Sequence, residues 1–516
     1  MSIPLPSPPR SEAEQIVLLA QELAWARLKI QALEAELRLE RIKKYGPASE
    51  SLTSAQLALL EEEPGVSTAE VAEESARPPL PEEPKAEPRA VARTVPEKPR
   101  HPGRQSLPSH LKRVERLISC TPEQCACSHC GQQTEVIGYD TSEQLDVEPA
   151  QYFVLVTKRE KRGCSSCARG VTTAPVPARI VEKGLASDRV VIDTVVAKYS
   201  DHLPLYRQSM MLARDAGIDI SRATLTGWVM RVGELLTPLV ERMRRELLSG
   251  SYLQADETPV EVQTHEGRGK NHQAYLWQYG RPEASLVFDF QMGRGREGPK
   301  QFLSGYHGIL QTDGYAAYER VGGPGMVHAA CWAHARRKFV DALKLNPQDG
   351  QAAQMVARMD ALFAVDAEAR ARGLDQAGRL ALRQEQARPL LERLRQDLER
   401  VRTQALPASA LGKAAHYTLG LWPKLIRFLE HAELELSNNL AENSMRGVAV
   451  GRKNWIHIGS AQAGPRVAAI LSVIESCRRL RIPVRDYLGA VLPGLASRTL
   501  PQLAQLTPAA WASRPR

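Results

Sequence analysis

The chain has 516 residues, a hydrophobic content of 43% and a formal net charge of +9 at pH 7. This length predicts about two to four domains. Neither a bilayer-spanning apolar run nor a signal peptide is visible, so we expect a cytosolic protein and neither a membrane protein nor a secreted one. The positive charge favours an anionic partner, with nucleic acid as the first candidate.

The segment 12–60 begins with a predicted helix over 12–43, in which apolar residues recur at heptad spacing. The repeating positions are Ile16, Leu19, Leu23, Ala26, Ile30, Leu33 and Leu37. This spacing predicts a short coiled coil that joins copies of the chain into a homo-oligomer; an amphipathic helix packed on its own domain is the alternative. Residues 61–108 are rich in Pro, Glu and Ala, which predicts a linker. Its basic end, KPRHPGR, either contacts DNA or is a solvated linker end.

Six of the eight cysteines fall within 109–180, which we predict to be a zinc-binding domain. In a cytosolic chain, such clustering indicates a metal site rather than disulfides. Two CxxC pairs at the tips of a zinc ribbon would supply the four thiolates of a tetrahedral Zn²⁺ site. The four predicted ligands are Cys127, Cys130, Cys164 and Cys167. Competing ligands lie nearby: Cys120, Cys125 and His129. Free thiols would leave the paired spacing unexplained.

Residues 181–245 contain three predicted helices, over 187–199, 204–216 and 221–235. Gly217 ends the second helix, and Ser221 is a good N-cap for the third. A helix, a short turn and a second helix that begins with Arg and Thr are similar to a helix-turn-helix, which reads the DNA major groove. An ordinary helical hairpin is the alternative.

Between 246 and 460, short apolar runs bounded by Gly, Pro and polar residues predict successive strands, interrupted by a helical stretch at 345–430. Two runs end in an aspartate: Asp256 follows SYLQA and Asp313 follows GILQT. Acids at the ends of adjacent strands repel one another unless a cation lies between them, and Mg²⁺ and Mn²⁺ prefer such oxygen ligands. The pattern therefore predicts a site for a divalent cation.

A third acid, Glu442, stands among amides and cations in the stretch LSNNLAENSMRGVAVGRKN. The segment NLAENSMR can form a helix, on which Arg446 falls one turn after Glu442 on the same face. Three acids around two metal ions about 4 Å apart would activate water or a 3′-hydroxyl for phosphoryl displacement. The cations that would hold the phosphate backbone are Arg446, Arg452 and Lys453. Any one of these acids alone would be read as a surface carboxylate.

These segments resemble the DDE transposases of the insertion sequence 66 family. The matching stretches are IVEKGLASDRVVIDTVVAKYSDHLPLYRQ, ADETPVEV, LQTDGYAAYE, HAACWAHARRKF and NNLAENSMRGVAVGRKNWIHIGS. The resemblance implies a multidomain α/β protein with an RNase H-like core, whose helical insertion lies between the second and third acids, and a C-terminal helical segment at 461–516. It also implies an N-terminal leucine zipper, a zinc-binding domain and a metal-binding triad of Asp256, Asp313 and Glu442.

As a function, the resemblance implies a transposase that binds the terminal inverted repeats of its element in double-stranded DNA. It would cleave that DNA with metal-activated water and join the freed 3′ ends to target DNA. The zinc domain and the helix-turn-helix would bind DNA, and helper proteins of the same element are further expected partners. The alternatives are a DNA-binding protein without catalysis and an RNase H-like nuclease without strand transfer.

Two positions depart from the family pattern. Ser437 stands where D-N-N-x-A-E has its Asp, although Ser can still cap the helix, and Gly447 stands where Pro is common. The CWAH motif, Cys331 to His334, has too few ligands for a tetrahedral metal site, so we expect a structural or DNA-facing role near the active site. The start of an amphipathic helix is the alternative. The cations expected on the substrate side are Arg336, Arg337 and Lys338.

Overall fold

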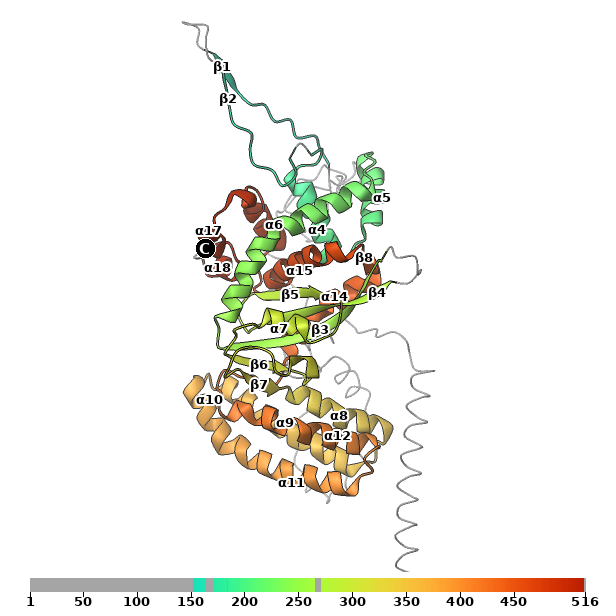
Figure 1. Cartoon of the computed structure of the whole chain (residues 1–516), viewed down its shortest axis with the longest axis vertical. Helices are drawn as coiled ribbons and strands as arrows, with labels where there is room; N and C mark the ends of the chain where they lie inside the picture. The colour runs from blue at the N-terminus through green and yellow to red at the C-terminus, as the bar shows by residue number, and fades with distance from the viewer. Residues whose placement is uncertain (1–151, 164–170, 183, 265–270, 515–516) are drawn as a thin grey trace, which may run out of the picture. The chain divides into compact units, whose positions relative to one another are not determined.

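The computed structural model describes residues 152–163, 171–182, 184–264 and 271–514. The predicted coiled coil at 12–60, the linker at 61–108 and the four predicted zinc ligands lie outside the described residues. Contacts divide the chain into two compact units, and every element described below belongs to the unit that contains residues 155–516 (Figure 1). Of the predicted zinc-binding domain, the structure describes a short antiparallel pair, β1 (Lys161–Gly163) and β2 (Val171–Thr173).

A mixed six-stranded sheet forms the centre of this unit, in the order β5-β4-β3-β6-β7, with β8 pairing with β3 as well. Its strands are β3 (Tyr252–Val262), β4 (His272–Gly280), β5 (Leu286–Gln291), β6 (Ile309–Thr312), β7 (Val327–Ala330) and β8 (His457–Ile458). β3 is antiparallel to β4 and parallel to β6 and β8. The first residues of β3 are buried without alternation, as expected for a strand covered on both faces.

Helices that precede and follow strands β3–β7 in the sequence cover the sheet. α6 (Arg222–Leu248) packs against α15 (Gly464–Arg479), and both contact β5, while α14 (Asn439–Trp455) packs on β3 and β4 (Figure 1). The edge strand β5 is protected because the hydroxyls of Ser472 and Ser476 accept hydrogen bonds from its backbone at Phe288 and Leu286.

The three helices predicted over 187–235 are present as α4 (Asp188–Tyr199), α5 (Leu205–Ala216) and α6. Gly217 ends α5 in the left-handed region at φ 65°, and the Ser221 hydroxyl caps α6 by accepting the Thr224 amide at 3.2 Å. The third helix, expected to end at 235, continues to Leu248 through Pro238. Tertiary packing explains this extension, because α6 shares one hydrophobic core with the sheet and α15.

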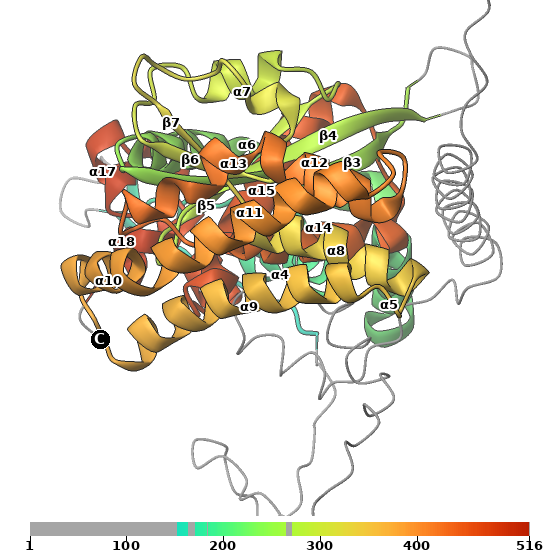
Figure 2. The ribbon, with the colours of Figure 1, turned by 90° about the horizontal axis from the view of Figure 1, so that it is seen from below.

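The helical stretch between β7 and α14 packs around a second hydrophobic core, which also includes Tyr252, Ile309, Ala329 and Ala330 of the sheet. Its main helices are α8 (Trp332–Leu345), α9 (Gly350–Ala371), α10 (Gln376–Leu382), α11 (Arg388–Gln404), α12 (Ala410–Gly420) and α13 (Trp422–Leu425). A π-helical turn, Arg383–Ala387, joins α10 to α11. The helices α8, α9, α11 and α12 lie side by side and form an inserted helical layer (Figure 2).

Short helices complete the unit: α7 (Glu297–Phe302), α16 (Val484–Val491), α17 (Leu500–Ala504) and α18 (Pro508–Ala512). Single 3₁₀ turns occur at Ala316–Tyr318, Ile426–Leu429, Ala461–Ala463 and Leu495–Ser497. Within the part of the chain that the structure describes, no helix combines the length and the apolar character needed to span a bilayer.

A buried ion pair anchors the inserted helices. The side chains of Arg383 and Asp366 are 0% and 1% exposed, and the Arg383 guanidinium donates to both oxygens of Asp366. The same guanidinium also donates to the carbonyls of Phe428 at 3.0 Å and Leu434 at 2.8 Å. Arg383 therefore ties the insertion to the segment that leads back to α14.

Replacing Arg383 with Ala should lower the free energy of unfolding by about 3–5 kcal/mol, because the buried Asp366 carboxylate would keep only Arg379 and the carbonyls of Phe428 and Leu434 would lose their buried donor. Urea denaturation followed by circular dichroism measures this change. Arg402→Ala is the matched control, since Arg402 forms an exposed ion pair with Glu399 that should contribute about 0–1 kcal/mol. Equal effects of the two substitutions would contradict the anchoring role of Arg383.

Candidate active site

Two of the predicted acids lie on adjacent parallel strands. Gln254 of β3 is opposite Gln311 of β6, and continuing this register by two residues places Asp256 beside Asp313, on the same face as the glutamines. Asp313 directly follows β6, as expected, whereas the prediction that Asp256 ends its strand is wrong. β3 continues to Val262 because β4 and β8 still pair with it where the pairing with β6 ends.

A buried layer of amides lies beneath these acids. The Gln254 side chain donates to the carbonyl oxygen of Ser437 at 2.9 Å, and the Gln311 side chain donates to that of Glu435 at 2.7 Å. The two glutamines are at most 1% exposed and also bond to one another at 3.1 Å. The segment 435–438, which they hold, leads directly into α14, whose first turn contains Glu442. The amide layer therefore brings the third acid to the strands that carry the first two.

The CWAH motif fixes the same segment from the other side. The Trp332 amide donates to the carbonyl of Leu436 at 2.8 Å, and the Asn438 amide donates to the buried Cys331 thiol at 3.4 Å. The Trp332 indole N–H donates to the carbonyl of Leu425 at 2.9 Å. Cys331 and Trp332 thus have the structural role that was expected near the acids, and they set the position of α8 relative to α14.

Two side chains of α8 face the carboxylate of Glu442. Arg337 donates from Nη2 to Oε2 at 3.4 Å, and Nδ1 of His334 lies 3.5 Å from Oε1. Burial lowers the pKa of His334, opposed by the negative charge of Glu442. The sequence prediction did not assign His334 to the acids. The spacing of His334 and Arg337, three residues apart on one helix face, could have indicated that both reach the same neighbour.

The electrostatics of Asp256 show that the acids interact. Its pKa is raised well above its usual range, first by burial and then by the negative charges of Glu442, Glu257 and Asp313. The hydrogen bond to its carboxylate comes from the backbone amide of Glu257, at 2.9 Å. Glu257 itself, which is 2% exposed, is bound by Arg294 at 2.7 Å and by the Tyr318 hydroxyl at 2.9 Å.

The turn after β6 fixes Asp313. Its carboxylate accepts the Tyr315 amide at 2.8 Å, and its carbonyl accepts the Tyr417 hydroxyl from α12. Gly314, between them, has φ +95°, and a Cβ at this position would lie 2.6 Å from Leu421 Cδ1. Any other residue would therefore be strained here and would displace either α12 or the turn.

The three acids suit a divalent cation in chemistry and charge. Among the described residues, no three His, Cys, Asp or Glu side chains are gathered closely enough to hold a metal ion as they stand. Several buried polar atoms near Glu442 have no hydrogen-bond partner there: Glu442 Oε1, His334 Nδ1, Asn438 Oδ1 and Nδ2, and Asn439 Oδ1. These unpartnered atoms lie beside carboxylates whose negative charges repel one another. Both features fit a site that would be completed by a cation and its water molecules.

The predicted phosphate-binding cations lie on two helices, α14 and α8. Arg446 falls on the same face of α14 as Glu442 and has no ion pair or hydrogen bond within the described residues, and Lys453 is exposed. Arg452 instead donates to the Thr258 hydroxyl and the Pro259 carbonyl of β3, at 3.0 and 2.6 Å. In α8, Arg336 contacts Asp360 of α9 at 2.6 Å, and the ammonium of Lys338 lies 5.5 Å from the centre of the Tyr417 ring.

The two departures from the family pattern have different structural outcomes. Asn438 rather than Ser437 occupies the N-cap position of α14, without a side-chain cap, so the expected capping by Ser437 is wrong. The Ser437 carbonyl is turned to Gln254 instead. A Cβ on Gly447 would lie 2.4 Å from Glu475 Oε1, so the glycine permits close packing of α14 on α15.

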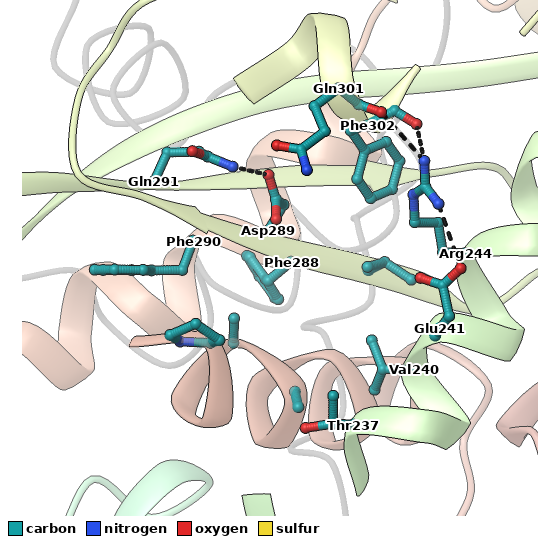
Figure 3. A pocket seen from close by; sticks show the side chains of 14 residues that line it. Thr237, Val240, Glu241, Arg244, Phe288, Asp289, Phe290, Gln291, Gln301 and Phe302 are labelled. Atoms are coloured by element: carbon teal, nitrogen blue, oxygen red, sulfur yellow. Dashed lines mark hydrogen bonds and ion pairs between the residues drawn. The ribbon is translucent and has the colours of Figure 1, made fainter. Parts of the chain in front are cut away.

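A separate cavity of about 310 Å³ lies between α6, β5, α7 and α15 (Figure 3). Two of its charged groups have partners: Arg244 donates to the carbonyl of Phe302 at 2.7 Å, and Asp289 accepts from Gln291 at 2.8 Å. None of the three acids lines it. We interpret this cavity as a packing gap between layers and not as part of the candidate site.

The fold and the acids define a multidomain α/β protein with an acidic site that is assembled from two strands and a helix. The model described as "Transposase IS66 family" matches residues 183–466, and this range contains all of these elements. The chain belongs to the IS66 transposase family.

Two further family models match the N-terminal part of the chain. The model described as "zinc-finger binding domain of transposase IS66" matches residues 124–168, a range that contains all four predicted zinc ligands and supports zinc binding. The model described as "Transposase C of IS166 homeodomain" matches residues 32–116 and so covers part of the predicted coiled coil together with the linker.

Three proteins of Sinorhizobium fredii (strain NBRC 101917 / NGR234) are similar to the chain over most of its length. The uncharacterized protein y4jD is 33% identical over 79% of this chain and 83% of its own length. The uncharacterized protein y4qI is 32% identical over 79% of this chain and 75% of its own length. The uncharacterized protein y4hP is 30% identical over 80% of this chain and 77% of its own length.

Asp256→Asn should stabilise the metal-free protein at neutral pH, because it removes a negative charge that burial and neighbouring acids disfavour. The pKa of Asp256 is higher in the folded state than in the unfolded state, so ionised Asp256 destabilises the fold at pH values above the folded-state pKa. The advantage of Asn disappears progressively as the pH falls from the folded-state pKa to the unfolded-state pKa. Thermal unfolding in EDTA should show a rise of roughly 1–3 °C at neutral pH.

The exposed Asp219 provides the matched control, and Asp219→Asn should leave the melting temperature unchanged at each pH. An Asp256→Asn variant that is less stable than the wild type at neutral pH would contradict the repulsion among the acids.

Proposed function

We propose that the chain is a metal-dependent DNA transposase in which Asp256, Asp313 and Glu442 hold Mg²⁺ or Mn²⁺ in an RNase H-like core. The observation that carries this proposal is the convergence of the three acids, two through the register of β3 and β6 and the third through the bonds from Gln254 and Gln311. Membership of a transposase family is the independent support.

The bound cations would activate a water molecule or a 3′-hydroxyl and stabilise the leaving oxygen. The residues of the chain provide the geometry: Asp256 is fixed within β3, Asp313 by the turn at Gly314, and Glu442 by α8. Arg446 and Lys453 would bind the phosphate backbone beside the acids. In this proposal Arg452 acts indirectly, by fixing α14 on β3.

Recognition of the terminal inverted repeats would use the α5–α6 pair and the zinc-binding domain. The first turn of α6 presents exposed Arg222 and Thr224, and the turn before it has the length and the glycine of a helix-turn-helix. Pairing of two chains through the N-terminal coiled coil would hold both DNA ends at high effective concentration for joining to target DNA. We propose that the protein acts in the cytoplasm on the nucleoid, with helper proteins of its element as further partners.

Alanine substitution of Asp256, Asp313 or Glu442 should each reduce DNA cleavage and strand joining on the order of 10³-fold, because each removes a proposed metal ligand. The substrate is a duplex carrying the inverted repeats that flank this reading frame, assayed with Mg²⁺ or Mn²⁺. Binding of that duplex, measured by fluorescence anisotropy, should remain nearly intact. Asp486→Ala, which changes an exposed acid of α16 outside the proposed DNA-binding elements, is the control.

The same assay separates the alternatives. Loss of binding together with chemistry in the three variants would contradict the catalytic assignment. No metal-dependent nicking by the wild type would favour a DNA-binding protein without catalysis. Nicking without joining would favour an RNase H-like nuclease.

The zinc ligands are tested separately. Purified protein should contain zinc by elemental analysis, and Cys127→Ser should release it because a tetrahedral site loses one of its four ligands. Cys120→Ser should retain the zinc if the CxxC pairs form the site, and this distinguishes the ligands from the neighbouring thiols. Zinc that remains bound after Cys127→Ser would overturn the ligand set.

A further inference from the structure

The carboxylate of Glu442 is already engaged by a cation of the chain. Nη2 of Arg337 lies 3.4 Å from Oε2, and the two side chains are 31% and 24% exposed. By contrast, His334 Nδ1 and Glu442 Oε1, 3.5 Å apart, each lack a hydrogen-bond partner. Arg337 therefore supplies the positive charge that contacts Glu442 in the metal-free protein, and His334 only lies alongside.

The position of Arg337 is set by the fold. The start of α8 is tied to the segment before α14 by the Trp332 amide and the Cys331 thiol, and the Trp332 indole is tied to Leu425. Arg337 lies little more than one turn further along α8. Since α8 and the start of α14 are bonded together, the guanidinium and the carboxylate stay close without requiring a strong bond between themselves.

The contact between Arg337 and Glu442 is long for a charge-assisted hydrogen bond. Charge-assisted N–H···O bonds are typically about 2.7–2.9 Å long, and the 3.4 Å between Arg337 and Glu442 is well beyond that range. The structure offers a contrast in Arg294 and Glu257, whose 2.7 Å contact joins a carboxylate that is 2% exposed. One acid of the region thus has a close internal cation, and the other has a more distant one.

We propose that Arg337 is an internal counter-ion for Glu442, which it releases when a divalent cation binds the carboxylate, so that the guanidinium becomes available to a DNA phosphate. This proposal rests on the proposed metal-dependent function. Without metal, Arg337 offsets the repulsion among Asp256, Asp313 and Glu442. On metal binding, the same positive charge opposes the incoming cation, so Arg337 has opposite effects on metal binding and on DNA chemistry.

The test measures Mn²⁺ binding to the full chain without DNA, by titration calorimetry or by the electron paramagnetic resonance of free Mn²⁺. Arg337→Ala should tighten Mn²⁺ binding about two- to fivefold, as expected for removal of a competing, partly exposed charge. At saturating Mn²⁺ the same variant should cleave DNA at least about tenfold more slowly, because a phosphate ligand is missing. Arg337→Lys should retain Mn²⁺ binding closer to that of the wild type.

Arg336→Ala is the matched control, since it removes the same charge from the neighbouring residue, which contacts Asp360 instead. Its Mn²⁺ affinity should be unchanged. Glu442→Gln identifies the site and should weaken Mn²⁺ binding. Circular dichroism checks that each variant is folded.

The outcomes separate the two proposals. If Glu442→Gln weakens Mn²⁺ binding but Arg337→Ala leaves it unchanged or weakens it too, the counter-ion role is overturned and the metal site stands. Equal tightening by Arg336→Ala and Arg337→Ala would also overturn it, because net charge alone would explain the effect. If the wild type binds no Mn²⁺, or Glu442→Gln binds it equally well, both the counter-ion role and the proposed metal site fail.

Discussion

The candidate site depends on the hydrogen bonds from two buried glutamines, Gln254 and Gln311, to the carbonyls of Ser437 and Glu435. These bonds cross the boundary between the sheet and the segment that returns from the inserted helices. Burying an amide or a carbonyl without a hydrogen-bond partner costs free energy. The two glutamine amides and the two carbonyls therefore favour the one alignment in which they bond to one another. That alignment places the first turn of α14, with Glu442, over the strands of Asp256 and Asp313. The sheet alone could position two acids but not three.

The inserted helices can be large because they pack around a second core, which they share with β3, β6 and β7, and because their return to the sheet is fixed. Arg383, fully buried with Asp366, binds the carbonyl of Leu434, directly before the segment that the glutamines hold. A chain of contacts thus runs from the insertion through 434–438 into α14. The insertion also contributes to the site itself, since α8 brings Arg337 to Glu442 and α12 brings Tyr417 to Asp313. It is both a scaffold and a wall of the candidate active site.

Local patterns predicted the strands, the helices at 187–235 and the position of Asp313, because periodicity and capping act over a few residues. The setting of Glu442 among amides and cations made it the candidate third acid, and the family resemblance then implied the triad and the family to which the chain belongs. The predicted end of α6 and the predicted place of Asp256 at the end of its strand were wrong, because tertiary partners decide both. α15 supports the longer helix, and β4 and β8 extend the strand beyond Asp256. The bond from Gln254 to Ser437 joins positions 183 residues apart, and the inward turn of Arg452 is likewise a tertiary contact that no local pattern indicates.

The neighbouring acids Asp256 and Glu257 differ in how the fold neutralises them, and this difference bears on the proposed cation site. Both carboxylates have raised pKa values because burial disfavours their charge. On its face of β3, Glu257 receives a guanidinium from Arg294 and a hydroxyl from Tyr318. On the other face, the hydrogen bond to the Asp256 carboxylate comes from a backbone amide, and the nearby charges that disfavour its ionisation are those of other acids. A fold that neutralises one of two adjacent carboxylates internally and surrounds the other with further acids supports the proposed cation site.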